Sequence, residues 1–333
     1  MSAPAIAPWI AVQTSALLAQ RGHAWLLAGP SGLGQYSLAL ALVRAWLCEA
    51  ASKQGACGVC GSCHAVDVRT HADLCVLMPE TVMLELGWPL SEKAQAEIDD
   101  KKRKPSKEIR VDAMREAVEF SQRTSARGKG KAVLVFPAER MNNVTANALL
   151  KTLEEPAGDV KFVLACDAAH QLLPTIRSRC LGHSMVWPDA VSALTWLQAQ
   201  GMSAAQAGVL LRAAGGRPED ALLFSKSGRD AQAWVRLPKA MAQGDVTVLK
   251  DWSPAQAVDA LHKLCHDVLA VQMGADPRFF DIVDLPAGGS VQSLTAWAKS
   301  LATSTRTVEH PFNAGLMLET LVSQAKFALN SAH

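Results

Sequence analysis

The stretch that decides the fold covers residues 24–36 and reads AWLLAGPSGLGQY. Its first five residues form a short apolar run, which is typical of a buried strand. A glycine-rich loop follows over 29–34, and the Ala- and Leu-rich stretch over about 35–48 has the composition of a helix. A strand, a glycine loop and a helix in this order predict the opening of an α/β nucleotide-binding domain.

Two further apolar runs, over 132–136 and 161–165, have the character of central strands. A helix is expected between them, over about 144–154, because Pro156 stops the helical pattern there. The strand–helix–strand order predicts a mostly parallel sheet with helices on its faces.

The pattern changes at residue 188, and from there to the end the sequence shows helical periodicity with almost no strand signal. We therefore expect an α/β domain over 1–187, a small helical domain over 188–227 and an all-α C-terminal domain over 228–333.

The composition excludes several classes of protein. The 333 residues include 33 Lys and Arg and 31 Asp and Glu, so the net charge is only +2. Bulk positive charge therefore cannot drive nucleic-acid binding as it does in histone-like proteins. A hydrophobic content of 49% excludes wholesale disorder. The apolar stretch over 38–48 contains Arg44 and falls short of the ~20 residues of a membrane helix. The start, residues 1–8, lacks the basic and apolar regions of a signal peptide. We expect a cytoplasmic protein without membrane contact.

The glycine loop has the spacing of a phosphate-binding P-loop but not its chemistry. Gly29 and Gly34 match G-x-x-x-x-G-K-[ST], whereas the Lys and Ser/Thr positions hold Gln35 and Tyr36. Loss of the cation that contacts the β- and γ-phosphates costs about 1.5–3 kcal/mol, and the Mg²⁺-binding hydroxyl is also lost. An ATPase needs an acidic residue at the end of a strand to hold Mg²⁺, but after the predicted strand 132–136 the first acid is Glu139, beyond Pro137 and Ala138. We expect a loop kept for structure; weak nucleotide binding and a working ATPase are the alternatives.

Four cysteines have the spacing C-x8-C-x2-C-x2-C: Cys48, Cys57, Cys60 and Cys63. Four soft thiolates suit a tetrahedral Zn²⁺ in a closed, structural site, and His64 could replace one of them. An iron–sulfur cluster is an alternative, but the ferredoxin spacing does not continue after the third close cysteine. Free thiols are the other alternative. The cysteines without such spacing are expected to be small core residues: Cys75, Cys166 and Cys265.

Residues 79–107 carry several acidic side chains followed by a basic run over 101–104. We expect an exposed insertion that forms a solvated loop or a short charged helix. The alternative is a loop whose clustered cations contact phosphates.

Four sequence blocks now occur in a fixed order: the altered loop over 29–36, the four cysteines, NALLKTLEEP over 147–156 and SRC over 178–180. In this the chain resembles the AAA+ clamp-loader family of bacterial DNA polymerase III. The cysteines combined with an altered P-loop resemble the delta-prime branch rather than the ATP-hydrolysing tau/gamma branch. The likeness is strong in the α/β domain, continues weakly to residues 310–313, and does not include 79–107.

The resemblance implies an AAA+ module over 1–187, a helical lid over 188–227 and a collar over 228–333 that oligomerises. It implies a heteropentamer with tau/gamma ATPase subunits and a delta subunit, which loads a sliding clamp onto primed DNA within the polymerase III holoenzyme. This chain is expected to carry structural Zn²⁺ and not to hydrolyse ATP. The alternatives are a zinc-containing DNA-binding adaptor and a weak AAA+ ATPase.

The same resemblance assigns Arg179 as an arginine finger that reaches into a neighbour's ATP site, with Ser178 orienting the turn. A guanidinium that neutralises charge on the γ-phosphate is worth ~10³–10⁵ in rate. A surface ion pair is the alternative for Arg179. The lid arginine of ATPase relatives corresponds to Glu219 here, close to Arg217.

The block over 147–156 combines a core stripe with two acidic residues. Leucines on one face of the predicted helix are expected to be buried: Leu149, Leu150 and Leu153. Glu154 and Glu155 could complete the interface with a neighbouring subunit.

Overall fold

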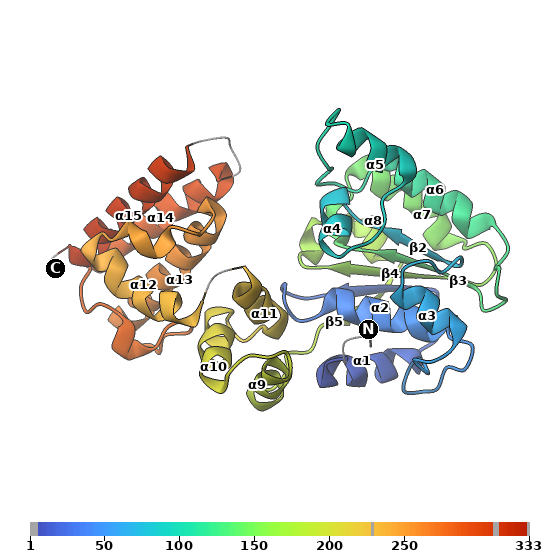
Figure 1. Cartoon of the computed structure of the whole chain (residues 1–333), viewed down its shortest axis with the longest axis horizontal. Helices are drawn as coiled ribbons and strands as arrows, with labels where there is room; N and C mark the ends of the chain where they lie inside the picture. The colour runs from blue at the N-terminus through green and yellow to red at the C-terminus, as the bar shows by residue number, and fades with distance from the viewer. Residues whose placement is uncertain (1–5, 228–229, 309–312, 332–333) are drawn as a thin grey trace. The chain divides into compact units, whose positions relative to one another are not determined.

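A computed structural model describes residues 6–227, 230–308 and 313–331 (Figure 1). Most of the resemblance block at 310–313, and the first five residues, lie outside the described residues. The chain divides into two compact units, one ending at Trp187 and the other beginning at Pro188. The further division of the second unit at residue 227 stays a prediction.

The first unit is built on a five-stranded sheet in the order β2-β3-β4-β1-β5, and every neighbouring pair is parallel. Its strands are β1 Ala24–Ala28, β2 Leu74–Leu77, β3 Lys131–Val135, β4 Val160–Cys166 and β5 Leu181–Ser184. The three predicted strands are confirmed as β1, β3 and β4, at the centre of the sheet. The expected α/β domain followed by helices is likewise confirmed.

Helices cover both faces of this sheet (Figure 1). One face packs against α2 Gln35–Leu47, with α1 Pro8–Leu18 against α2. The opposite face shares a hydrophobic core with α6 Val111–Gln122, α7 Asn143–Glu154 and α8 Pro174–Arg177. Leu149 and Leu153 of α7 are fully buried and Leu150 is partly buried, as predicted. The remaining elements are α3 Gly61–Asp67, α4 Glu80–Glu85, α5 Glu92–Asp99, η1 Ala138–Arg140 and η2 Ala169–Gln171.

The expectation of an exposed insertion over 79–107 is wrong in part. Glu80 at the start of α4 is only 7% exposed and Trp88 only 6%. The carboxylate of Glu80 can be buried because it accepts hydrogen bonds from Arg103 Nη2 at 2.8 Å and from the backbone N–H of Ser106 at 2.8 Å. Arg103 also pairs with Glu97 at 2.7 Å, so this member of the basic run is already neutralised within the chain.

The prediction that Cys75 is a core residue is confirmed only in part, because Cys75 packs against the core of that sheet face but is not fully buried. Cys75 lies on β2, an edge strand with a neighbour on one side only, and it is half-buried. Cys166 and Cys265 are buried, as predicted. None of the eight cysteines forms a disulfide.

The described part of the second unit is entirely helical, as predicted. Its helices are α9 Ala190–Ala199, α10 Ala204–Ala213, α11 Pro218–Lys226, α12 Ala231–Gln243, α13 Pro254–Gln272, α14 Val291–Thr307 and α15 Ala314–Asn330, with η3 Val246–Leu249 and η4 Ile282–Asp284. One hydrophobic core includes residues from all seven α-helices, and Trp234 stacks within it on Phe280 at 4.6 Å. Across the described ranges, no helix has both the length and the apolar character that a membrane span requires.

Candidate functional site

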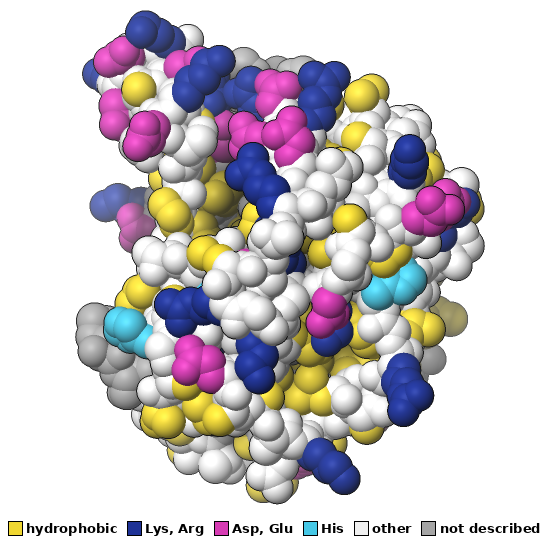
Figure 2. Space-filling model, turned by 90° about the vertical axis from the view of Figure 1, so that its right-hand side faces the viewer, with side chains coloured by type: hydrophobic (Ala, Val, Ile, Leu, Met, Phe, Trp, Pro, Cys, Tyr) yellow, Lys and Arg dark blue, Asp and Glu magenta, His cyan; other side chains and the backbone are white. Residues whose placement is uncertain are grey.

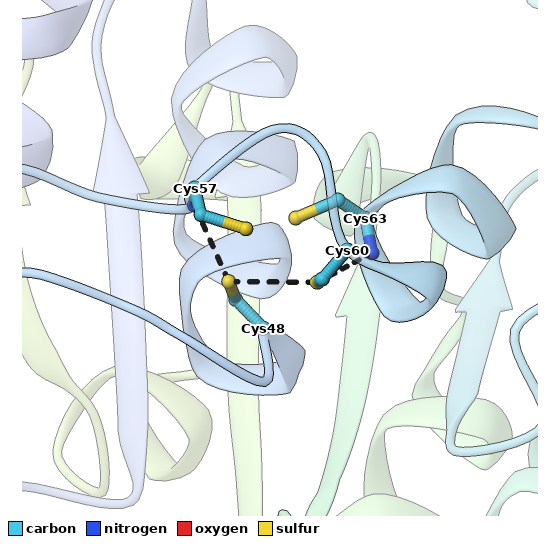
Figure 3. A group of neighbouring side chains, drawn as sticks. All are labelled: Cys48, Cys57, Cys60 and Cys63. Carbon is cyan, nitrogen blue, oxygen red and sulfur yellow. Dashed lines mark hydrogen bonds between the residues drawn. The ribbon is translucent and has the colours of Figure 1, made fainter.

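The four predicted metal ligands come together at the C-terminal end of α2 (Figure 3). Cys48 directly follows α2, Cys57 and Cys60 lie on the next loop, and Cys63 belongs to α3. Their Sγ atoms all lie within 4.8 Å of one another, and those of Cys48 and Cys60 are 3.8 Å apart. A tetrahedral Zn²⁺ with bonds of ~2.3 Å needs sulfurs about 3.8 Å apart, so the residues fit the ion. His64 is exposed and is not part of the group, which overturns its suggested role as a substitute ligand.

The cysteine loop is held in shape by its own backbone. Gly58 has a φ of +77°, a left-handed conformation that strongly favours glycine, and it turns the chain between Cys57 and Cys60. Cys48 Sγ accepts from the N–H of Cys57 at 3.3 Å, and Cys60 Sγ accepts from the N–H of Cys63 at 3.4 Å. Such bonds orient the sulfurs towards one another.

These hydrogen bonds also favour the thiolate form that binds metal. Burial works against the charge on Cys60, but hydrogen bonds from the N–H groups of Cys63 and Glu49 outweigh it and lower the pKa of Cys60 to about 6. The N–H groups of Val59 and Cys60 lower the pKa of Cys57. Burial raises the pKa of the Cys63 thiol. Two of the four ligands are thus biased towards ionisation by the fold.

A supporting residue that the sequence did not reveal is Glu49, next to Cys48. Its Oε1 accepts from Ser62 N–H and Oγ, both at 3.1 Å, and from Arg127 Nη1 at 3.2 Å. Glu49 therefore ties the cysteine loop to the loop that precedes β3. Its position beside a predicted ligand was the one available signal.

The phosphate loop lies at the opposite end of α2, where Gly34 caps the helix with a φ of +96°. Gln35 is 2% exposed, and its Nε2 donates to Gly29 O at 2.7 Å, Pro30 O at 2.8 Å and Asp167 Oδ1 at 2.9 Å. The side chain in the Lys position is thus bound to the loop itself. Asp167 adds a carboxylate beside the loop, which would repel phosphate.

Sequence reasoning missed Asp167 because its place depends on the order of the strands. Asp167 follows β4, and β4 lies beside β1, which leads into the phosphate loop. Glu139, after β3, accepts at Oε1 from the N–H of Asp167 at 3.0 Å. The acid after β3 therefore supports the position of Asp167.

Tyr36 connects the phosphate loop to the 79–107 segment. Its hydroxyl accepts from Trp88 Nε1 at 2.7 Å, and its ring centroid lies 5.4 Å from that of Phe136. Burial raises the pKa of Tyr36, although the bond from Trp88 and the charge of Arg69 oppose this. The hydroxyl in the Ser/Thr position is thus engaged with an indole.

Arg179 lies just after α8 and pairs with Glu154 at the end of α7. Its Nε donates to Glu154 Oε1 at 2.6 Å, and its Nη2 bonds the same oxygen. Its Nη1 donates to Thr175 O at 2.8 Å, and Ser178 Oγ donates to the same carbonyl at 3.2 Å. Ser178 and Arg179 are therefore brought together, and the guanidinium stays half-exposed.

In the second unit, Arg217 pairs with Asp220 at 2.8 Å across the first turn of α11. Glu219 lies in the same turn. The basic side chain nearest to the predicted lid position is thus already bound to an acid.

A parallel sheet in the order β2-β3-β4-β1-β5, with a glycine loop between β1 and α2 and a helical unit after it, defines an AAA+ class protein. Residues 9–185, more than half of the chain, match the family described as DNA polymerase III, delta subunit. The chain belongs to this family.

Curated relatives carry the name DNA polymerase III subunit delta'. The protein of Pseudomonas aeruginosa is 40% identical over 194 residues, which are 58% of this chain and 52% of that protein. The protein of Escherichia coli K12 is 34% identical over 242 residues, 71% of this chain and 65% of that protein. The chain thus matches between about half and two thirds of these relatives' length.

Two further comparisons are more distant. DNA polymerase III subunit tau of Escherichia coli is 33% identical over 159 residues, 48% of this chain and 21% of that protein. A solved gamma subunit-related protein of Thermotoga maritima shares the fold, with a TM-score of 0.50 at 15% identity, over 96% of this chain and 99% of that one.

Proposed function

We propose that this chain is a non-hydrolysing subunit of the DNA polymerase III clamp loader. The observation that carries the proposal is the state of the phosphate loop. The amide of Gln35 bonds two loop carbonyls and Asp167, and the hydroxyl of Tyr36 is bonded to Trp88. A nucleotide would have to displace these bonds and approach the carboxylate of Asp167 without a compensating lysine.

The partners in this proposal are tau/gamma ATPase subunits and a delta subunit, and through them the sliding clamp and primed DNA. Names of relatives support this assignment, since a delta' protein and a tau protein both match part of this chain. The lid over 188–227 and the collar over 228–333 belong to the same proposal, with the collar as the oligomerising part of a heteropentamer in the cytoplasm.

Arg179 is proposed as the arginine finger for a neighbour's ATP site, with Ser178 orienting its turn. The half-exposed guanidinium and its pair with Glu154 support this role, because a planar fork that holds a carboxylate also fits a phosphate. Binding to the γ-phosphate would exchange one anion for another. The Arg179 guanidinium could leave Glu154 for the phosphate because the Glu154 side chain is also exposed to solvent.

The four cysteines are proposed to hold one structural Zn²⁺. When bound, the ion would hold the four thiolates together and would have a structural role only. The chain's own contribution is to orient the sulfurs through the hydrogen bonds to Cys48 and Cys60 and to fix the loop through Glu49.

The test is ATP hydrolysis, stimulated by clamp and primed DNA, in an assembly reconstituted with tau/gamma and delta subunits. Arg179→Ala should lower turnover on the order of tenfold or more, since a finger is worth ~10³–10⁵ at its own site. Arg177→Ala, an exposed arginine of α8 two residues earlier, is the matched control and should leave turnover unchanged. Size-exclusion chromatography must show that both variants assemble. Unchanged turnover with Arg179→Ala would refute the finger.

A further inference from the structure

The 79–107 segment forms one wall of a groove of about 700 Å³ in the first unit. The other walls are β2 and α6. Its lining combines apolar and charged side chains, among them Leu90, Phe120 and Glu116. On the side of the molecule drawn in Figure 2, hydrophobic side chains gather in hollows whose rims carry acidic and basic residues.

The groove runs along the open edge of the sheet. All residues from 74 to 78 line it, although their side chains alternate between the two faces of the sheet. A lining of consecutive residues therefore means that the groove follows the backbone of β2 itself. β2 is the end strand of the sheet order, so this edge has no neighbouring strand.

The register shows which backbone groups face the groove. The carbonyls of Asp73 and Leu77 accept from the N–H groups of Ala132 at 2.9 Å and Phe136 at 3.0 Å, on the β3 side. Backbone groups of successive strand residues point to opposite sides, so the N–H and C=O of Val76 point to the open edge. An unpaired edge of this kind is a template for another strand.

The side walls add chemical selectivity. Trp88, with the Arg69 guanidinium 5.3 Å from its ring, lines the insertion side, and Phe120 lines the α6 side. Glu116 of α6 forms no ion pair with any described residue. Its charge reaches into the groove, because together with burial it raises the pKa of Cys75. A strand laid along β2 would therefore find apolar surface, the negative charge of Glu116 on the α6 side, and the positive charges of Arg69 and Lys93 on the insertion side.

We propose that this groove binds an extended peptide segment of a partner protein by strand addition to β2. The segment would carry apolar side chains at alternate positions and a Lys or Arg opposite Glu116. Main-chain hydrogen bonds to Val76 provide part of the affinity, and the side walls provide the selectivity. This docking site is distinct from the phosphate loop and Arg179, which do not line the groove, although Trp88 of its wall is hydrogen-bonded to Tyr36.

The test uses the full chain and two fluorescein-labelled peptides of about nine residues, enough to pair with β2 and extend past it. Both alternate valine and threonine; one has a central lysine and the other a central glutamate. Fluorescence anisotropy should show saturable binding with at least a ~10-fold preference for the lysine peptide, a difference of about 1.4 kcal/mol. Absence of saturable binding would overturn the proposal.

Val76→Pro removes the outward N–H while leaving the β3 side intact, and edge strands tolerate proline at such positions. It should lower affinity for the lysine peptide at least ~10-fold with an unchanged circular dichroism spectrum. If this variant does not fold, Ala113→Trp, which fills the groove from α6, should cause the same loss of affinity for the lysine peptide. Binding that survives a folded blocking variant would overturn strand addition.

Glu116→Lys should reverse the preference between the two peptides. Glu119→Lys, on the same helix but outside the groove lining, is the matched control and should leave the preference unchanged. An equal effect of both substitutions would show a general charge effect and refute the pairing with Glu116.

Discussion

The two ends of α2 carry the two motifs of the sequence, and they differ in what their polar atoms contact. At the C-terminal end, the four cysteine sulfurs lie within 4.8 Å of one another. At the N-terminal end, the Gln35 amide is bonded to two loop carbonyls and to Asp167. Both loops keep the residue spacing of a binding site, glycines in the phosphate loop and cysteines in the other. The side chains in each loop, and not the spacing of its residues, therefore decide whether the loop can still bind a ligand.

The largest expected effect tests the cysteine end. Cys63→Ser removes a buried ligand, so protein purified without chelator should lose most of its zinc and unfold ~5–10 °C lower, a shift of a few kcal/mol for a domain of this size. Elemental analysis and calorimetry measure both. Cys75→Ser, outside the cluster, is the control and should retain zinc. Wild-type protein without zinc would refute the metal site.

The next effect tests the phosphate-loop end by rebuilding it. Gln35→Lys with Tyr36→Thr restores the cation and the hydroxyl, and adding Asp167→Asn removes the opposing charge. Each charge-assisted contact is worth about 1.5–3 kcal/mol, so affinity for Mg-ATP should rise about tenfold or more at each step. Isothermal titration calorimetry measures the series, with Asp167→Asn alone as control. Wild-type affinity equal to that of the triple variant would contradict our interpretation of the loop.

These two ends also show how far the sequence alone could go. The cysteines are close in sequence, so spacing was sufficient to predict that they converge. Asp167 reaches the phosphate loop only because β4 lies beside β1, and strand order is not a local property. The Tyr36–Trp88 bond joins residues 52 positions apart and left no periodic signal.

The same distinction holds for the fold. The central strands β1, β3 and β4 are covered on both faces and form apolar runs, which the sequence displays directly. The edge strands β2 and β5 are four residues long and partly exposed, and β5 reads LGHS, so neither gave a signal. The groove beside β2, and the half-buried Cys75 in it, could not be inferred without knowing that β2 lies at an edge.

A smaller effect concerns the support of the cysteine end at low pH. Burial works to raise the pKa of Asp73, but hydrogen bonds from the N–H groups of Ala126 and Arg127 and from Ser125 Oγ outweigh it and lower the pKa. A carboxyl with a lowered native pKa stabilises the fold above its unfolded pKa of ~3.9, and this contribution is lost as pH falls through the lower native value. Asp73→Asn should therefore be less stable than wild type by about 1–2 kcal/mol near pH 7, and this gap should close below pH ~4. Urea unfolding at several pH values measures the gap; a gap that is constant with pH would exclude the carboxylate's charge as its cause.

The smallest expected effect concerns the bond between the phosphate loop and the 79–107 segment. Tyr36→Phe leaves Trp88 Nε1 without its acceptor and should lower the free energy of unfolding by about 1 kcal/mol. Urea unfolding of Tyr36→Phe, Trp88→Phe and the double variant isolates the pair in a double-mutant cycle. A coupling energy near zero would mean that solvent satisfies both groups equally well. In that case the Tyr36 hydroxyl could exchange Trp88 for water or a ligand at little cost. The hydrogen bond to Trp88 would then not keep this hydroxyl from a nucleotide.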